Sequence, residues 1–224
     1  MLFDDFSEAD AIAIRGNRIL SVGTDGEVRA AAGEDALVVD LAGKTVMPGL
    51  VCTHSHVGEP WGADRAHPIQ PEARVLDGMN VRASSVERAR AGGLTTLNCM
   101  PGSGHLLSGQ TIYLKLREGR TIDDLTIKDP DGAVMGGIKM ANGTNSIRLK
   151  PFPGTRGKSA ALVREQFIKA QEYNAKWDAW NAKAETEDDP GSPPARDPRS
   201  ETRRRRAPLR ATRAGGKGSD RSHR

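Results

Sequence analysis

Apolar and polar residues alternate over short stretches in the first forty residues of the chain. Apolar runs at 11–14 and 19–22 flank the polar sequence RGNR at 15–18, a pattern that predicts a β-hairpin. Residues 24–26 (TDG) read as a further turn, and 37–41 (LVVDL) predict another short strand. The beginning of the chain is therefore expected to be β-rich.

The next apolar run is nearly continuous over residues 45–53 and leads into His54 and His56. Continuous apolar character favours a strand that is buried on both faces, as in a parallel sheet covered by helices. Pro48 and Gly49 would interrupt a central strand, so the strand is expected to begin after them. Residues two apart on a strand share a face, so the two imidazoles can both reach one metal ion.

Short strands and helices continue to alternate beyond the histidines. The pattern predicts a loop over 57–83 with a short helix near 72–77, a helix over 84–91, strands over 94–100, 111–116 and 133–140, and a helix over 158–184 with one broad apolar face. Ser84 is expected to cap the helix that it begins, and Gly92-Gly93 to end it. Such alternation is typical of α/β proteins.

The composition changes at about residue 185. Residues 186–224 contain one large aliphatic residue, Leu209, among Pro, Gly, Ser and Arg. Such a segment buries too little apolar surface to offset its ordering entropy, so 185–224 is predicted to be disordered. Residues 187–224 hold 11 Lys/Arg and 6 Asp/Glu, which gives +5 and leaves −1 for the rest of the chain. The net charge of +4 therefore belongs to the tail.

The basic tail raises the question of nucleic-acid binding. The run Arg203–Arg206 could bind phosphates electrostatically. However, no aromatic residue is interleaved for base stacking, which argues against specific nucleic-acid recognition.

The cysteines and the hydropathy profile indicate a cellular location. Cys52 and Cys99 lie in apolar runs, which favours buried thiols in a reducing compartment. The acidic sequence at 1–10 has no apolar core of the kind that a secretory signal needs. The sequence contains no run of about 18 apolar residues, so no transmembrane helix is predicted. The expected location is the cytoplasm.

The order of motifs in the chain resembles the amidohydrolase superfamily. The residues that carry the resemblance are DLAGK at 40–44, VMPGL at 46–50, HSH at 54–56 and AGGLTT at 91–96. The imidazolonepropionase-like branch also has counterparts of PGSG at 101–104, SGQ at 108–110 and GIKMANG at 137–143. The resemblance covers about residues 10–183.

The resemblance implies a fold and a chemistry. The expected α/β fold is a partial (β/α)8 TIM-type metallo-hydrolase barrel at 46–184, preceded by a small β-sandwich segment at 1–45 and followed by the disordered tail at 185–224. His54 and His56 would be metal ligands at the end of the first barrel strand. The expected cofactor is a divalent ion, zinc above all, which activates a water that attacks the C–N bond of a small amide or cyclic amide substrate.

The resemblance also implies ligands beyond the two histidines, because a catalytic zinc usually has three protein ligands. The family pattern has a bridging lysine or glutamate in some branches, two more histidines, and an aspartate that acts as base. Here His67 is expected to be exposed in a Pro-bounded loop, and His105 to be a polar loop residue. His223 lies in the tail, and Lys139 is a candidate for the site, with a packed or loop lysine as the alternative.

The length available for a barrel leaves two functional hypotheses open. Residues 46–184 are about 140 residues, against about 250 for a complete barrel, which leaves room for three or four strands. The chain is then either an active metal-dependent amidohydrolase or a catalytically incomplete fragment without turnover. The third, less favoured hypothesis is a nucleic-acid-binding protein that uses the basic tail. A further hypothesis concerns the tail at 185–224, because a shifted reading frame in a GC-rich gene would produce a segment of this composition. Resequencing of the gene tests it. An intact single frame that ends here would refute it.

Overall fold

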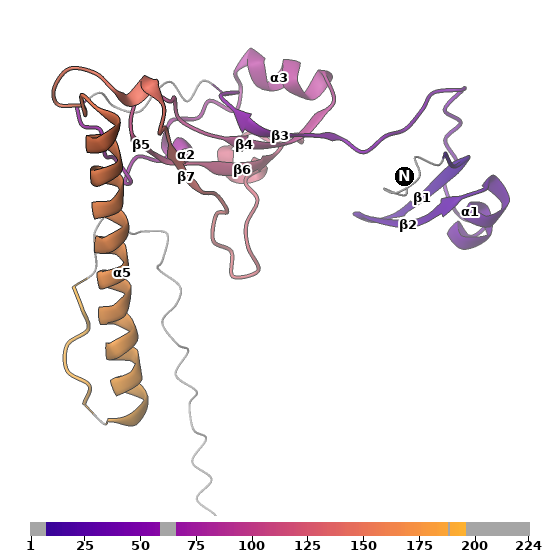
Figure 1. The fold of residues 1–224 in the computed structure, drawn as a ribbon. Coiled ribbons are helices and arrows are strands. Elements are labelled where there is room, and N and C mark those ends of the chain that lie inside the picture. The colour runs from indigo at the N-terminus through magenta and orange to yellow at the C-terminus, as the bar shows by residue number, and fades with distance from the viewer. Residues whose placement is uncertain (1–7, 59–65, 188, 196–224) are drawn as a thin grey trace, which may run out of the picture. The chain divides into compact units, whose positions relative to one another are not determined.

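The computed structural model describes residues 8–58, 66–187 and 189–195 (Figure 1). The chain divides into two units, residues 1–49 and 50–224. Unit 1 contains β1 (Ala11–Arg15), β2 (Arg18–Gly23) and α1 (Asp25–Ala32). Unit 2 contains β3 (Leu50–Ser55), α2 (Val75–Gly78), α3 (Ser84–Ala91), β4 (Leu94–Cys99), β5 (Leu107–Gln110), β6 (Ile112–Lys115), α4 (Ile122–Leu125), β7 (Ile138–Met140), the 3₁₀ turn η1 (Thr144–Ser146) and α5 (Arg156–Thr186).

Unit 1 is a β-hairpin with one helix. β1 and β2 pair antiparallel around the predicted turn, so the predicted hairpin is confirmed. The turn predicted at 24–26 is wrong, because α1 begins there. Thr24 and Glu27 form a capping box in which the amide and hydroxyl of Thr24 donate to Glu27 Oε2 at 3.1 and 2.7 Å. The T-x-x-E spacing of a helix start outweighs the local turn signal.

The strand predicted at 37–41 is also wrong. Leu37 is 91% exposed, and the segment pairs with no strand among the described residues. The segment ends in a local turn: the amide of Ala42 donates to Asp40 Oδ1, and the backbone of Ala42 is left-handed (φ 49°). A segment with high β propensity does not form a strand unless a neighbouring strand pairs with it.

Unit 2 is built on the three-stranded sheet β3–β4–β6. β3 and β4 are parallel, with α3 between them in the sequence, whereas β6 runs antiparallel to β4. β5 and β7 form a second, antiparallel pair. The fold of this unit is mixed α/β, although its third strand runs opposite to the direction that an all-parallel barrel requires. The sequence did not predict β5 or α4.

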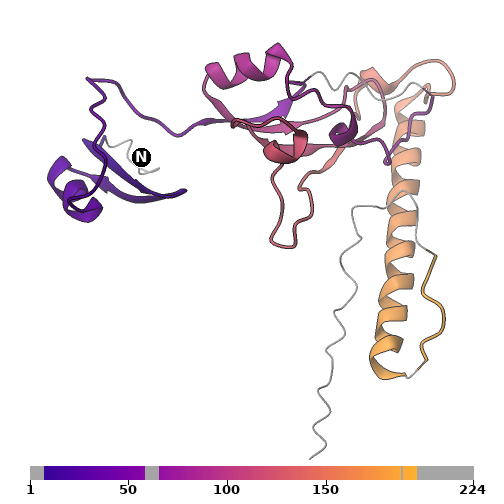
Figure 2. The same ribbon diagram turned by 180° about the vertical axis from the view of Figure 1, so that it is seen from behind.

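The core of unit 2 lies between α3 and one face of this sheet. The cross-strand pairs Leu97↔Leu114 and Cys99↔Ile112 put four buried side chains on that face. The helix α3 lies over the sheet (Figure 2). Its buried residues Val86 and Ala89 belong to the same core cluster as these side chains. Cys99 is buried as predicted, whereas Cys52 is only partly buried.

Two expectations about the strand and helix at this core are corrected. β3 is not buried on both faces: it lies at the sheet edge, and Leu50 and Val51 are 47% and 64% exposed. The predicted helix at 84–91 is confirmed, but Ala83 occupies the N-cap position and no side chain caps it. Ser84 is the first helical residue, and its Oγ accepts a hydrogen bond from Arg88.

The strand predicted over 133–140 is shorter in the structure. β7 begins only at Ile138, and the segment before it instead bonds to the neighbourhood of β6: the amides of Thr111 and Tyr113 donate to the carbonyls of Gly137 and Met135 at 2.8 and 2.9 Å. A Cβ at Gly136 would lie 1.9 Å from the Thr111 carbonyl oxygen.

The predicted C-terminal helix is confirmed and slightly longer than expected. α5 begins after Thr155, whose Oγ1 accepts from the Lys158 amide at 3.2 Å. Among its large apolar side chains, Phe167 and Ile168 are 57% and 46% exposed, whereas Leu162, Tyr173 and Trp177 are partly buried. Residues 185 and 186, assigned to the tail from sequence, belong to this helix, and residues 196–224 of the tail lie outside the described part. Within that part, none of the helices has the length and apolarity needed to cross a membrane.

Candidate metal centre

His54 and His56 lie together at the carboxyl end of β3. His54 is in the strand and His56 follows its last residue, Ser55. The two ring centres are 5.3 Å apart, and the ring planes meet at 85°. The structure therefore brings together the two residues that the sequence singles out.

The His56 ring is oriented by the neighbouring strand. Its Nδ1 lies 2.8 Å from the carbonyl oxygen of Met100, the residue that follows β4. The Met100 amide donates in turn to the carbonyl of Ser55 at 2.9 Å. Because a carbonyl oxygen only accepts, the proton sits on Nδ1 and the Nε2 lone pair of a neutral ring remains available to a ligand.

Lys139 acts electrostatically on His54. The Lys139 ammonium is the largest cause that lowers the pKa of His54, followed by burial and by His56. Lys139 is on β7, and burial lowers its own pKa. The structure thus places this sequence candidate near the histidine pair. The charge of Lys139 favours the neutral form of His54, which is the form that binds metals.

The sequence analysis did not single out Asn98, a polar residue whose side-chain oxygen is buried. It lies on β4 and pairs across the sheet with Tyr113, on the face opposite the buried Leu97 and Cys99. Its Oδ1 is buried and accepts no hydrogen bond within the described residues. The alternation of Leu97, Asn98 and Cys99 was the available signal, because a polar residue between two core positions faces the other side of the sheet.

Neither of the other two described histidines, His67 and His105, joins the pair. His67 is exposed, as predicted. His105 is buried at 3% exposure and its ring centre lies 5.4 Å from that of Phe152. His105 thus lies in the loop before β5, as expected, but it is buried there beside Phe152 rather than exposed. His223 lies outside the described residues.

Potential protein ligands for an ion are few at this site. In the described ranges, no three His, Cys, Asp or Glu side chains are close enough together to hold a metal ion. Cys99 offers no thiolate, because burial raises its pKa to about 12, and its Sγ donates to the Val57 carbonyl at 3.0 Å. Among the described residues, the two imidazoles and the nearby lysine are what this region provides.

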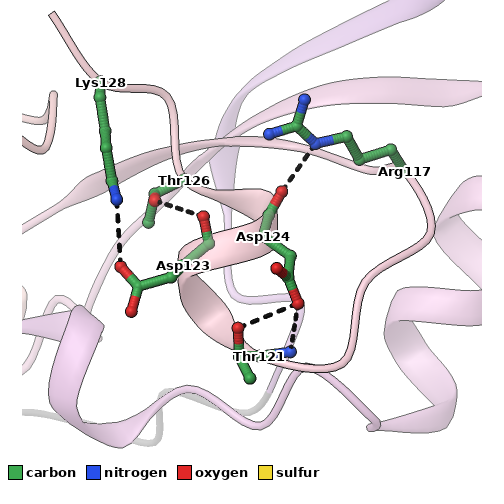
Figure 3. A network of polar contacts seen from close by, with 6 residues as sticks. All are labelled: Arg117, Thr121, Asp123, Asp124, Thr126 and Lys128. Carbon is green, nitrogen blue, oxygen red and sulfur yellow. Dashed lines mark hydrogen bonds and ion pairs between the residues drawn. The ribbon is translucent and has the colours of Figure 1, made fainter. Parts of the chain in front are cut away.

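A second polar cluster surrounds α4 (Figure 3). Residues 117–121, 123 and 124 line an open hollow there. The carboxylate of Asp124 accepts from the Arg120 amide at 2.8 Å and from the amide and hydroxyl of Thr121 at 2.8 and 2.9 Å. These bonds lower the Asp124 pKa. Arg117 Nε donates to the Asp124 carbonyl at 2.6 Å, and Lys128 pairs with Asp123 at 3.3 Å. The cluster caps a helix and ties down a loop, so it has a structural explanation.

Comparisons with known proteins agree on one enzyme group, although no protein-family model matches the chain. The chain is 51% identical over 49 residues to an N-substituted formamide deformylase of Arthrobacter pascens, covering 22% of this chain and 9% of that protein. It is 28% identical over 116 residues to a dihydroorotase of Caldanaerobacter subterraneus subsp. tengcongensis, covering 52% of this chain and 24% of that protein. The crystal structure of an amidohydrolase from Thermotoga maritima superposes with a TM-score of 0.65 and 31% identity, covering 80% of this chain and 48% of that chain. The chain thus spans less than half the length of each of these proteins.

Proposed function

We propose, on the premise that this chain belongs to the amidohydrolase superfamily, that His54 and His56 are part of a metal centre that hydrolyses a C–N bond. The observation that carries the proposal is the histidine pair itself, with ring centres 5.3 Å apart and His56 anchored through Nδ1 to Met100. The names of the relatives support amide-type chemistry, and we extend it to a small amide or cyclic amide as substrate.

The donor set fits a zinc-like divalent ion. Two imidazole nitrogens each about 2.1 Å from one tetrahedral ion would place their ring centres roughly 5 Å apart, close to the observed separation. A His56 that donates through Nδ1 and keeps Nε2 free matches the usual outer-shell arrangement of histidine ligands. A zinc ion would supply a Lewis acid that polarises the scissile carbonyl and makes water acidic near neutral pH.

The residues of the chain contribute positioning and charge control. The backbone carbonyl of Met100 fixes the His56 tautomer, so this ring does not need to reorient when it binds. The charge of the Lys139 ammonium lowers the pKa of His54 and so favours the neutral, metal-binding form of that imidazole. We assign Lys139 as the third site residue on this basis, in agreement with the bridging lysine that the family resemblance implies.

The architecture that we propose around this centre is the first part of a (β/α)8 barrel. The β3–α3–β4 unit supports it, because two parallel strands are joined through a helix that packs on the sheet. The histidines sit at the carboxyl end of β3, and active sites of barrels are built at the carboxyl ends of their strands. The 31% identity and TM-score of 0.65 with the Thermotoga maritima amidohydrolase support the same view.

A second candidate function is ion binding without turnover. The observation that favours it is the lack, within the described residues, of a third His, Cys, Asp or Glu beside the pair. Two imidazoles hold an ion far less tightly than the three ligands that are usual for a catalytic zinc.

Hydrolysis assays separate the two candidates. The purified chain would be loaded with Zn²⁺ and assayed on a cyclic ureide and on an N-substituted formamide, with a chelator-treated sample as control. Metal-dependent turnover that His54→Ala removes and His67→Ala retains would support the enzyme. Metal binding with no turnover on either substrate would instead support the second candidate and contradict the first.

A further inference from the structure

The pairing of β3 with β4 is irregular just before the end of β3. The register shifts between Cys52 and Ser55. At this bulge two residues of β3, Thr53 and His54, stand opposite a single residue of β4, Asn98. Bulges are frequent beside active sites, where they turn a side chain in a new direction. The register of the sheet therefore makes His54 and Asn98 neighbours across the two strands.

His54 and Asn98 also lie on the same face of the sheet. Ser55 pairs with Cys99, and the two are buried at 5% and 0% exposure. His54 and Asn98 each come directly before one of these paired residues, so their side chains project from the opposite face. The side chain of Asn98 is thus on the side of the sheet that carries the candidate metal centre.

Asn98 presents an acceptor that lacks a donor. Its Oδ1 is buried, and no described residue donates a hydrogen bond to it. A buried acceptor without a partner destabilises the fold, so a donor is expected within reach. Tyr113 pairs with Asn98 from β6, but its hydroxyl oxygen lies 4.0 Å from the position that a Cβ would occupy at Gly137. The phenol thus extends toward the segment before β7, which leaves the donors of β3.

His54 presents a donor that lacks an acceptor. Within the described residues, neither of its ring nitrogens takes part in a hydrogen bond, whereas His56 donates through Nδ1 to the Met100 carbonyl. His54 is exposed, so its ring can turn about its side-chain bonds. A histidine that binds a metal usually donates its second ring N–H to an oxygen acceptor. One imidazole of the pair has this support, and the other has an unused acceptor opposite it on β4.

We propose that Asn98 is a positioning residue for His54, and that its Oδ1 accepts a hydrogen bond from the Nδ1–H of the His54 imidazole. The bond fixes the tautomer of His54 and leaves its Nε2 for an ion, as the Met100 carbonyl does for His56. The strand β4 and the residue that follows it then orient both imidazoles. The inference rests on the metal centre proposed above for its purpose, but the bond itself is detectable in the metal-free chain.

NMR of the full chain with ¹⁵N-labelled histidines tests the hydrogen bond. At pH about 8.5 an imidazole with the usual pKa of about 6.5 is neutral, and its ¹⁵N shifts report which ring nitrogen carries the proton. We expect the Nδ1–H tautomer for His54 in the wild type and a shift toward the other tautomer in Asn98→Leu, which has a similar volume but no acceptor. Asn98→Asp keeps an acceptor and should restore the Nδ1–H tautomer.

Two controls separate this effect from a change in the fold. Thr53→Val removes the other donor that stands opposite Asn98 and should leave the His54 tautomer unchanged. The tautomer of His56 should be the same in every variant, because a backbone carbonyl holds it.

Co²⁺ titration of the same variants tests what the bond contributes to the site. Asn98→Leu should weaken Co²⁺ binding roughly 10- to 100-fold, the usual effect of removing an outer-shell partner of a histidine ligand. Asn98→Asp should bind Co²⁺ at least as tightly as the wild type, because its carboxylate is the stronger acceptor.

Three results would overturn the proposal. The first is the same His54 tautomer in the wild type and in Asn98→Leu. The second is a tautomer that Thr53→Val changes as strongly as Asn98→Leu does. The third is a Co²⁺ affinity that His54→Ala weakens and Asn98→Leu does not. A wild type that binds no Co²⁺, in which Asn98→Leu still changes the tautomer, would instead support the hydrogen bond and contradict the metal centre.

Discussion

The Nδ1 atom of His56 lies 2.8 Å from the carbonyl oxygen of Met100, so the end of β4 orients the histidine that follows β3. The bond joins two parallel strands where their carboxyl ends meet. It fixes which ring nitrogen carries the proton and which is left for a ligand. A local strand pairing thus prepares one imidazole for the chemistry that we propose.

Removal of the Lys139 charge should change the pKa of His54. Lys139→Gln removes the largest cause that lowers the His54 pKa, so this pKa should rise toward its ordinary value of about 6.5. An NMR titration of the imidazole resonances checks this. Lys115→Gln serves as the control, because Lys115 instead bonds to Thr96 Oγ1 at 2.9 Å. An unchanged His54 pKa in Lys139→Gln would separate the lysine from the site.

Two leucines with opposite environments test where the core lies. Leu97 is fully buried and Leu149 is 90% exposed. Leu97→Ala should lower the free energy of unfolding by about 2–5 kcal/mol, because it leaves a cavity between the sheet and α3. Leu149→Ala should change it by less than about 0.5 kcal/mol. Urea unfolding measures both, and equal effects would refute this core.

The approach of Gly136 to Thr111 should exclude any side chain. Gly136→Ala puts a Cβ 1.9 Å from a backbone oxygen, and should cost about 1–3 kcal/mol or more through forced backbone movement. Gly154→Ala is the matched control, since nothing lies within 4 Å of the position that its Cβ would occupy. Thermal unfolding of the two variants compares them directly. A Gly136→Ala chain as stable as the control would contradict the close approach.

The capping carboxylate of Asp124 should make stability depend on pH. Its pKa is lowered by the Thr121 and Arg120 amides and the Thr121 hydroxyl. The contribution is therefore present above the ordinary pKa of about 3.9 and is lost as the pH falls through the lowered folded value. The wild type should be more stable than Asp124→Asn near pH 6, and the difference should shrink below pH about 3. A difference that does not vary with pH would contradict this role of the cap.

The sequence predicted those elements whose partners are close in the chain. The β1–β2 hairpin and the α3–β4 unit follow from turn residues, helix-ending glycines and apolar runs, which act locally. The segment 37–41 has the same β character but forms no strand, because a strand requires a neighbour that the local pattern does not supply. α1 was missed because the same TDG sequence suits a turn, and only Glu27 distinguishes a capping box.

The same distinction holds for the candidate site. The spacing of His54 and His56 was enough to predict that they could act together. The anchor of His56 is a backbone carbonyl 44 residues away, and a backbone group leaves no mark in a side-chain pattern. The proximity of Lys139 to His54 depends on the pairing of β5 with β7, and β5 was not predicted at all. Burial of His105 depends likewise on a distant contact with Phe152.

The measurement that tests the central claim most directly is a Co²⁺ titration of the full chain, followed by its visible absorption, with Zn²⁺ as competitor. We expect one ion per chain that Zn²⁺ displaces. His54→Ala and His56→Ala should each weaken binding at least about tenfold through loss of a ligand, whereas His67→Ala should leave it unchanged. Equal affinity in the wild type and in the variant that lacks both His54 and His56 would contradict the metal centre.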